Sequence, residues 1–205
     1  MHTNSKLLFA RHSLDLFRPG MRVLEIGPDD FPSSYRSLVA DRSITWDTLD
    51  RHGDARLTYA DTPEYAFPIP AGVYDIVLSG QVIEHVRKPW LWVRELARVC
   101  RIGGLVITIN PVSWPYHEAP IDCWRAFPEG MRALYEDASL EVLLSSWASL
   151  EATQFRRYIP GRSPECQPRL LRTAYGILGR FGFPVERAYD TITIGRKSKN
   201  ARSDS

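Results

Sequence analysis

The chain has 205 residues, of which 44% are hydrophobic and 24% are charged, as in an ordinary globular domain with a sizeable core. Its 26 basic and 24 acidic residues leave a formal net charge of +2, which gives no reason to expect nucleic acid or a membrane surface as a partner. No apolar run approaches the ~20 residues that span a bilayer, and we expect no secretory signal. Three widely spaced cysteines without a CxxC pair argue against a disulfide framework or a cysteine zinc site. We therefore expect a reducing, cytoplasmic setting.

Helices and strands are predicted to alternate along the chain. In the first part of the chain, the pattern predicts a helix over 6–17, a strand over 21–26, a helix over 33–40, a strand over 44–49 and a loop over 51–72. After the loop, it predicts a strand over 74–79, a helix over 89–101 closed by Gly103-Gly104, a strand over 105–109, a helix over 128–137 and a strand over 140–147. A last strand is predicted over 191–195, and a flexible polar tail over 196–205. This alternation indicates an α/β fold with a mainly parallel sheet, in a single domain over 1–205.

The segment 151–187 breaks this rhythm, because it is too long for a simple connection between two strands. It contains a predicted helix over 169–181. We expect this helical insertion before the last strand to act as a lid or substrate wall, or as a contact in a homo-oligomer. Its Arg156, Arg157 and Arg162 could meet an anionic acceptor, although such arginines are more often solvated surface.

The first strand ends in a turn that suits an adenosine ligand. Gly27 lets the backbone turn tightly and lets a ligand approach, and Asp50, at the end of the second strand, can accept both ribose hydroxyls. No GxGxxG is present, and the carboxylates of Asp29 and Asp30 would repel a pyrophosphate. They are compatible with the sulfonium and ammonium of S-adenosylmethionine. The alternative is that these two residues only cap the next helix.

Four segments, which follow one another along the chain in the family's order, resemble the class I S-adenosylmethionine-dependent methyltransferase family, and within it the methyltransferase type 11 group. They are VLEIGP, the Asp50 that follows a strand, YDIVLSGQVIEHV and ELARVCRIGGLVITI. The resemblance implies a Rossmann-like, doubly wound, seven-stranded sheet, mostly parallel with an antiparallel last strand. The cofactor-binding residues it implies are Glu25, Gly27 and Pro28 at the methionine end, Asp50 at the ribose, Asp61 and Thr62 at the adenine, and Ser79, Gly80 and Gln81 near the sulfonium.

Glu84-His85 could serve as an acid/base pair. In the family that it resembles, however, this segment generally orients the end of a strand and the start of the next helix. We favour the orienting role.

The segment after the strand over 105–109 is where the acceptor should lie. Trp114, Tyr116, Trp124 and Arg125 offer aromatic faces and directed polar groups that suit a saccharide or another small polar acceptor. A pattern like HxxPxDxWR, formed by His117, Pro120, Asp122, Trp124 and Arg125, resembles a subgroup often associated with surface-glycan pathways.

A hydroxyl acceptor must also lose a proton. His117 is the candidate base, because its ordinary pKa lies near neutrality, and Asp122 could orient it. The alternative is that His117, Asp122 and Arg125 form a structural knot that holds the loop. A divalent metal at His117, Glu118 and Asp122 is not expected, because these residues form no compact ligand motif.

The sequence therefore predicts an enzyme that transfers a methyl group from S-adenosylmethionine to an oxygen of a small polar or saccharide acceptor. One alternative is methylation of nitrogen or carbon in a small metabolite. A second is a non-catalytic cofactor-binding or assembly protein of the same fold, since Asp29 and Phe31 stand where the family has further glycines. A nicotinamide oxidoreductase is a third, which the absence of GxGxxG opposes.

Overall fold

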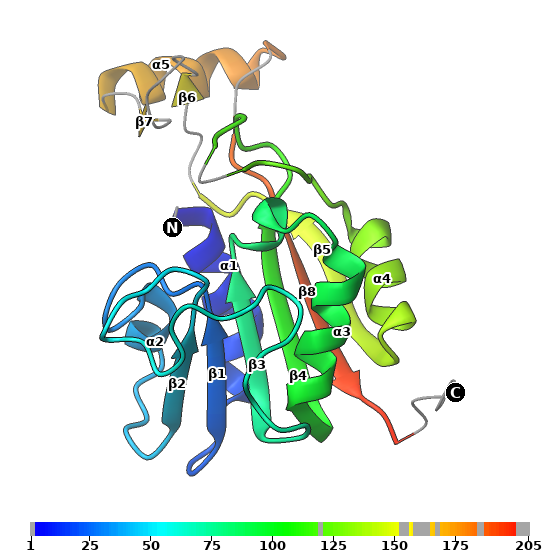
Figure 1. The fold of residues 1–205 in the computed structure, drawn as a ribbon. Helices are drawn as coiled ribbons and strands as arrows, with labels where there is room; N and C mark the ends of the chain where they lie inside the picture. The colour runs from blue at the N-terminus through cyan, green and yellow to red at the C-terminus, as the bar shows by residue number, and fades with distance from the viewer. Residues whose placement is uncertain are drawn as a thin grey trace.

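A six-stranded sheet with helices on both faces forms the body of the protein, as the computed structural model in Figure 1 shows. The structure describes residues 3–118, 121–151, 156–157, 165–166, 169–183 and 187–199. The strands of the sheet are β1 (Arg22–Ile26), β2 (Thr45–Leu49), β3 (Tyr74–Gly80), β4 (Cys100–Pro111), β5 (Leu140–Ala148) and β8 (Asp190–Lys197). The helices are α1 (Thr3–Ser13), α2 (Ser34–Leu38), α3 (Pro89–Val99), α4 (Pro128–Asp137) and α5 (Arg169–Arg180), with 3-10 turns η1 (Leu14–Leu16) and η2 (Ile83–His85).

The strands lie in the order β2-β1-β3-β4-β8-β5. The first four are parallel to one another, whereas β8 runs antiparallel to both of its neighbours, β4 and β5. The expected doubly wound sheet with an antiparallel last strand is therefore confirmed. From β1 the chain first adds β2 on one side and then β3 on the other, so the point between β1 and β3 is the switch point where α/β sheets bind ligands.

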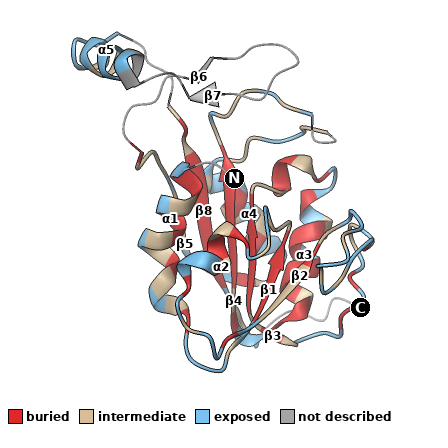
Figure 2. Cartoon of the chain, turned by 90° about the vertical axis from the view of Figure 1, so that its left-hand side faces the viewer, coloured by how far each residue is buried: buried red, intermediate tan, exposed pale blue. Residues whose placement is uncertain are grey.

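Each face of the sheet has its own apolar core. On one face α1 and α2 bury Leu8, Phe9 and Tyr35 against the strands. On the other face α3 and α4 bury Leu96 and Tyr135. Figure 2 shows the buried strands enclosed between these helices. Two-sided burial explains why β1, β3 and β4 read as continuous apolar runs.

The expected seventh strand is not formed within the described residues, and this part of the fold prediction is wrong. The segment after β2 contributes one isolated parallel bridge, Leu49↔Tyr59, beside the edge strand β2. It is held there by N–H donation from Tyr59 to Thr48 O and from Asp50 to Tyr59 O. The prolines that follow, Pro63, Pro68 and Pro70, lack the N–H that a longer ladder requires.

The expected end of α3 at Arg101, closed by Gly103-Gly104, is also wrong, because α3 ends at Val99 and β4 begins at Cys100. The carbonyls of Arg98 and Val99 accept the N–H groups of Gly72 and Val73, so neighbouring backbone satisfies the helix end without a glycine cap. The two glycines instead lie in β4, where the register with β3 shifts. A side chain at Gly104 would lie 2.8 Å from Asp75 O.

The predicted tail starts too early, since Arg196 and Lys197 belong to β8. The Lys197 ammonium donates to the carbonyls of Arg98 and Cys100, which fixes the end of this strand against the end of α3. Residues 200–205 lie outside the described residues. The flexibility predicted for the tail therefore stays a prediction.

Within the insertion, the structure describes α5 and a short antiparallel pair, β6 (Arg156–Arg157) and β7 (Glu165–Cys166). Figure 1 shows α5 beyond the end of the sheet toward which the parallel strands point. The side chains of Arg156 and Arg157, and the whole of Arg162, lie outside the described part. None of the helices that the structure describes has the length and apolarity needed to cross a membrane.

Candidate functional site

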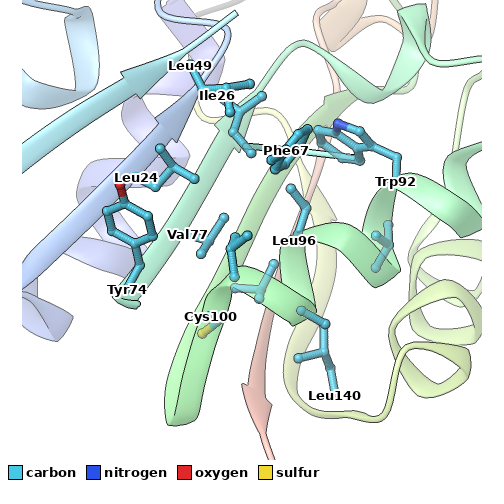
Figure 3. Close-up of a cluster of buried hydrophobic side chains, with 14 of the residues drawn as sticks. Leu24, Ile26, Leu49, Phe67, Tyr74, Val77, Trp92, Leu96, Cys100 and Leu140 are labelled. Carbon is cyan, nitrogen blue, oxygen red and sulfur yellow. The ribbon is translucent and has the colours of Figure 1, made fainter. Parts of the chain in front are cut away.

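A cavity of about 440 Å³ opens where β1, β2 and β3 end, at the switch point of the sheet. Its lining comes from three turns that follow these strands and from the edge of the core; it comprises Ile26, Gly27, Pro28, Asp29, Leu49, Asp50, Arg51, His52, Glu64, Phe67, Gln81, Val82, His85, Val86 and Trp92. Figure 3 shows Ile26, Leu49, Phe67 and Trp92 at one end of the buried cluster. The cavity is therefore apolar on the side of the core and polar on the side of the turns.

The turn after β1 requires a glycine. Gly27 has a φ of +71°, and a side chain there would collide with Val82 Cγ2. Its N–H donates to Leu49 O, 2.9 Å away, which ties the end of β1 to the end of β2. The predicted Gly27 and Pro28 thus form one wall of the cavity.

Asp29 lines the cavity and also caps α2. Its carboxylate accepts from the N–H and the hydroxyl of Ser34. Burial alone would raise the pKa of Asp29, but these hydrogen bonds outweigh it and lower the pKa, so the group is a carboxylate at neutral pH. The capping alternative is correct for Asp29, and it leaves a negative charge in the cavity wall.

Asp50, predicted to bind the ribose, lies in the lining at the end of β2. Thr62 is buried and donates both its N–H and its hydroxyl to the backbone carbonyl of Asp50. Thr62 therefore positions Asp50 from behind and does not line the cavity. Asp61 is exposed and also lies outside the lining.

Glu25 is predicted under the methionine end, but its side chain lies outside the lining. Its Oε2 accepts from the Ser33 hydroxyl and from Trp46 Nε1, and the side chain is buried. Burial raises the pKa of Glu25 to about 7, despite the two donors. In this position Glu25 links the N-terminus of α2 to β2.

Of the three predicted residues at the end of β3, only Gln81 lines the cavity. The Ser79 hydroxyl donates to Ile26 O within the sheet. Gly80 faces the core, where a side chain would lie 2.5 Å from Tyr35 Cε2. Gln81 Nε2 donates to Asp190 Oδ1, 3.1 Å away, so this residue joins the cavity to β8.

His85 contributes an imidazole to the cavity wall from η2. Its Nδ1 lies against Ile121 O, and the edge of the His117 ring meets it with 5.1 Å between ring centroids. Burial, more than any charge, lowers the pKa of His85 and keeps the ring neutral at pH 7. His117, the candidate base, therefore lies directly behind a residue of the cavity wall.

The predicted acceptor loop is fastened to the turn that carries His85. Cys123 N–H donates to Glu84 O at 2.6 Å, and Trp124 Nε1 donates to Val86 O at 2.8 Å. Together with the Ile121 contact of His85, these bonds hold 121–124 alongside η2. The Glu84-His85 segment thus holds the loop over 121–124 and also reaches the cavity, whereas the orienting role expected for it stays a prediction.

Asp122 and Arg125 form the structural knot that is the alternative to a catalytic role. The guanidinium donates to both carboxylate oxygens, at 2.5 and 2.6 Å, and Asp122 also accepts the N–H of His117. Arg125 further donates to Trp114 O and Pro115 O. Burial would raise the pKa of Asp122, but the bonds from Arg125 lower it. These contacts favour a structural role for both residues.

The predicted aromatic wall lies outside the cavity lining. Tyr116 is 56% exposed and donates to Glu118, whereas Trp124 is 40% exposed and packs edge-on against Trp90. Trp114 is partly buried, with its carbonyl bound by Arg125. These side chains offer an open aromatic surface on the loop that is tied to η2.

Several lining residues were not predicted, among them Phe67, Val82 and Trp92. Phe67 and Trp92 belong equally to the core cluster, and their sequence pattern is that of ordinary core residues. His85 was considered and assigned an orienting role alone. Its position directly after a strand end was the available signal.

Comparison with known proteins agrees with this geometry. Residues 41–108 match a family model described as a methyltransferase domain. A curated methyltransferase of Mycobacteroides abscessus, whose own activity is uncharacterized, is 33% identical over a match that covers 43% of this chain and 39% of that protein. The chain thus spans about two fifths of the length of the curated relatives it matches.

Solved structures share the fold over nearly the whole chain. A S-adenosylmethionine-dependent methyltransferase from Archaeoglobus fulgidus has a TM-score of 0.64 at 13% identity, covering 94% of this chain and 92% of that one. The chain therefore has the fold of S-adenosylmethionine-dependent methyltransferases. Phosphoethanolamine N-methyltransferase 2 of Haemonchus contortus, solved with phosphomonomethylethanolamine and S-adenosylhomocysteine, has a TM-score of 0.60 at 13% identity, covering 96% of this chain and 53% of that one.

Proposed function

We propose that this methyltransferase domain binds S-adenosylmethionine in the cavity and transfers its methyl group to an oxygen of a small polar acceptor. The observation that carries the proposal is that Gly27, Asp50 and His85, from three successive strand ends, line one cavity at the switch point. A nucleoside ligand and a group that acts on an acceptor would thereby meet in the same space.

The charges of the wall fit a cationic cofactor. Asp29 and Asp50 both line the cavity, and two carboxylates there favour a sulfonium and an ammonium over a pyrophosphate. Arg51 lies in the lining too, but its guanidinium pairs with Glu64 at 3.2 Å. The apolar edge formed by Phe67 and Trp92 suits a flat purine ring. This arrangement supports the cofactor predicted from the sequence over a dinucleotide.

We propose that His85 and His117 activate the acceptor hydroxyl. Both rings stand at the junction between the cavity and the acceptor loop, and an oxygen nucleophile becomes reactive only as its proton leaves. Asp122 is engaged by Arg125, and it meets His117 at the backbone N–H and, 3.4 Å away, at Nδ1, so its proposed part is to orient His117. The predicted catalytic pair His117–Asp122 becomes, in this proposal, a pair of imidazoles on a rigid loop.

A saccharide is the acceptor class that we propose. Tyr116 and Trp124 expose ring faces beside the site, and flat aromatic surfaces with nearby polar groups are typical of saccharide sites. We also propose that the protein works in the cytoplasm, since the described cysteines, Cys100 and Cys123, are both free.

The test is transfer of a labelled methyl group from S-adenosylmethionine to a panel of sugars and nucleotide sugars, with His117→Ala as the decisive variant. We expect the variant to lose at least about 100-fold in turnover, a common size for a lost acid–base group. Its affinity for S-adenosylhomocysteine should stay within about twofold, because His117 lies behind the lining. His12→Ala, in α1, is the matched control. Equal turnover in His117→Ala and wild type would remove His117 from the mechanism.

A further inference from the structure

A buried carboxylate without a partner lies next to the two imidazoles. Glu84, in η2, is 1% exposed, and neither of its carboxylate oxygens has a hydrogen-bond partner in the part of the chain that the structure describes. An isolated carboxylate in such a place is costly unless a proton or a cation accompanies it. The surroundings of Glu84 therefore decide what it can hold.

The first neighbour is His85, whose Nε2 lies 3.8 Å from Glu84 Oε1. The other ring nitrogen, Nδ1, faces the carbonyl oxygen of Ile121. A carbonyl can only accept, so Nδ1 carries the hydrogen and Nε2 of the neutral ring presents a lone pair. That lone pair and the Glu84 carboxylate are both acceptors, and either a proton or a metal ion between them would remove their repulsion.

The second neighbour, His117, has the same arrangement. Its Nδ1 lies 3.1 Å from Pro115 O and 3.4 Å from Asp122 Oδ2. Both partners are acceptors, so Nδ1 again carries the hydrogen, and Nε2 is the nitrogen through which the ring can bind a metal. Metal-ligating histidines typically donate their second ring N–H to a backbone carbonyl or a carboxylate in this way, which fixes tautomer and orientation.

We propose that Glu84, His85 and His117 bind a divalent transition-metal ion. One ligand atom from each residue can be chosen so that all three lie within 4.8 Å of one another. Two ligands about 2.1 Å from a tetrahedral ion lie roughly 3.4 Å apart. The 3.8 Å between Glu84 and His85 is therefore a few tenths of an ångström from a metal-bound geometry.

The donor set selects the kind of ion. Two imidazoles and one carboxylate favour zinc and its first-row neighbours, whereas magnesium and calcium prefer oxygen ligands alone. The ligands are also rigid, because η2 and the loop over 121–124 are joined by the Cys123 and Trp124 hydrogen bonds. Glu118 and Asp122, the other two possible ligands beside His117 in the sequence, are engaged by Tyr116 and Arg125.

Three protein ligands leave a position open on the ion, as in catalytic zinc sites. His85 lines the cavity, so the open position would be accessible to the acceptor. The role of the ion rests on the proposed function: it would bind the acceptor hydroxyl and lower its pKa. With their lone pairs on the ion, the two imidazoles would activate the hydroxyl through the ion and not as free bases. The hydroxyl proton passes to water, the oxygen–methyl bond forms as the sulfur–methyl bond breaks, and S-adenosylhomocysteine leaves. Binding of the ion itself does not depend on this role.

The test titrates the chelator-treated full chain with Co²⁺ alone, followed by its visible absorption, and with Zn²⁺ alone, followed by calorimetry. We expect one ion per chain and the visible bands of a cobalt site with nitrogen and oxygen ligands. Glu84→Gln, which keeps the shape of the side chain, and His117→Ala should each weaken binding at least about tenfold. His12→Ala should bind as the wild type does. Circular dichroism of each variant checks that the fold is kept.

No cobalt spectrum at millimolar metal, or unchanged affinity in both Glu84→Gln and His117→Ala, would overturn the site. The outcome is separable from that of the proposed function. If S-adenosylhomocysteine binds and cobalt does not, the metal site fails alone. If cobalt binds as expected and no methyl transfer is found with or without Zn²⁺, the metal site stands and the proposed function fails.

Discussion

Glu25, in the segment VLEIGP, stabilises the packing of α2 on the sheet and does not line the cavity. The family resemblance implies a place under the cofactor, whereas the structure has its carboxylate accept from Ser33 and Trp46, outside the cavity lining. The motif predicted the residue's importance but not the direction of its side chain. Direction depends on which face of β1 receives α2, and that is a property of the packed sheet.

Burial of Glu25 has a consequence for stability. Its pKa rises from the ordinary value of 4.5 to about 7 in the folded protein, so the neutral acid is favoured on folding. The resulting stabilisation is fully present below pH 4.5 and is lost as the pH rises through about 7. Glu25→Gln cannot titrate and lacks this dependence. Between pH 4.5 and pH 8, the free energy of unfolding of the wild type should fall relative to that of Glu25→Gln by up to about 3 kcal/mol.

Urea unfolding of both proteins at several pH values measures that difference, and the remaining titratable groups cancel because they are common to both. A difference that stays constant across this range would contradict the buried, neutral state of Glu25.

The contact between α2 and β3 explains why β3 ends in a glycine. Gly80 ends β3 against Tyr35 of α2, which is fully buried and bonded to the Ser5 hydroxyl. Gly80→Ala places a methyl group inside the space of the Tyr35 ring, so we expect the free energy of unfolding to fall by about 1–3 kcal/mol. Thermal or urea unfolding measures the loss.

Gly130→Ala is the matched control for that variant. Gly130 lies in α4 with open space around it, and alanine there should stabilise the helix by up to about 1 kcal/mol. A Gly80→Ala protein as stable as the wild type would show that α2 does not press on β3.

Most elements were predictable because their signals are local. The apolar runs of β1 and β3 and the proline that opens α4 predicted those boundaries to within a residue. The end of α3 was missed, since its carbonyls are satisfied by Gly72 and Val73, which are remote in sequence. The seventh strand was expected but is not formed within the described residues, because pairing at a sheet edge depends on what the neighbouring strand offers.

At the scale of the whole molecule, the cavity and the insertion are separate in sequence. All lining residues fall between Ile26 and Trp92, and the ends of the insertion meet where Ala148 pairs with Asp190 in the sheet. Replacing 152–186 by a short glycine-serine linker should therefore leave the affinity for S-adenosylhomocysteine within about threefold. As a lid or acceptor wall, the insertion should instead affect turnover. Calorimetry and methyl-transfer assays of the shortened chain measure both.

A shortened chain that keeps its fold by circular dichroism but binds S-adenosylhomocysteine more than about tenfold more weakly would contradict this division. Full turnover in the shortened chain would contradict the lid.

The candidate site could be predicted only in part, because some of its contacts join segments that are remote in sequence. Gly27, Pro28, Asp50 and Gln81 follow strand ends, so a motif read along the chain found them. The joining of His85 to His117 brings together η2 and a loop more than thirty residues later. No spacing in the sequence predicts that contact, and the proposed acceptor chemistry depends on it.

Calorimetric titration with S-adenosylmethionine and S-adenosylhomocysteine measures directly whether the cavity binds a methyl donor. We expect one site per chain in the wild type. We also expect binding to weaken about 10- to 100-fold in Asp50→Ala, the loss expected when hydrogen bonds to a charged group are removed. Absence of binding to either ligand at millimolar concentration would contradict the claim that this cavity is a methyl-donor site.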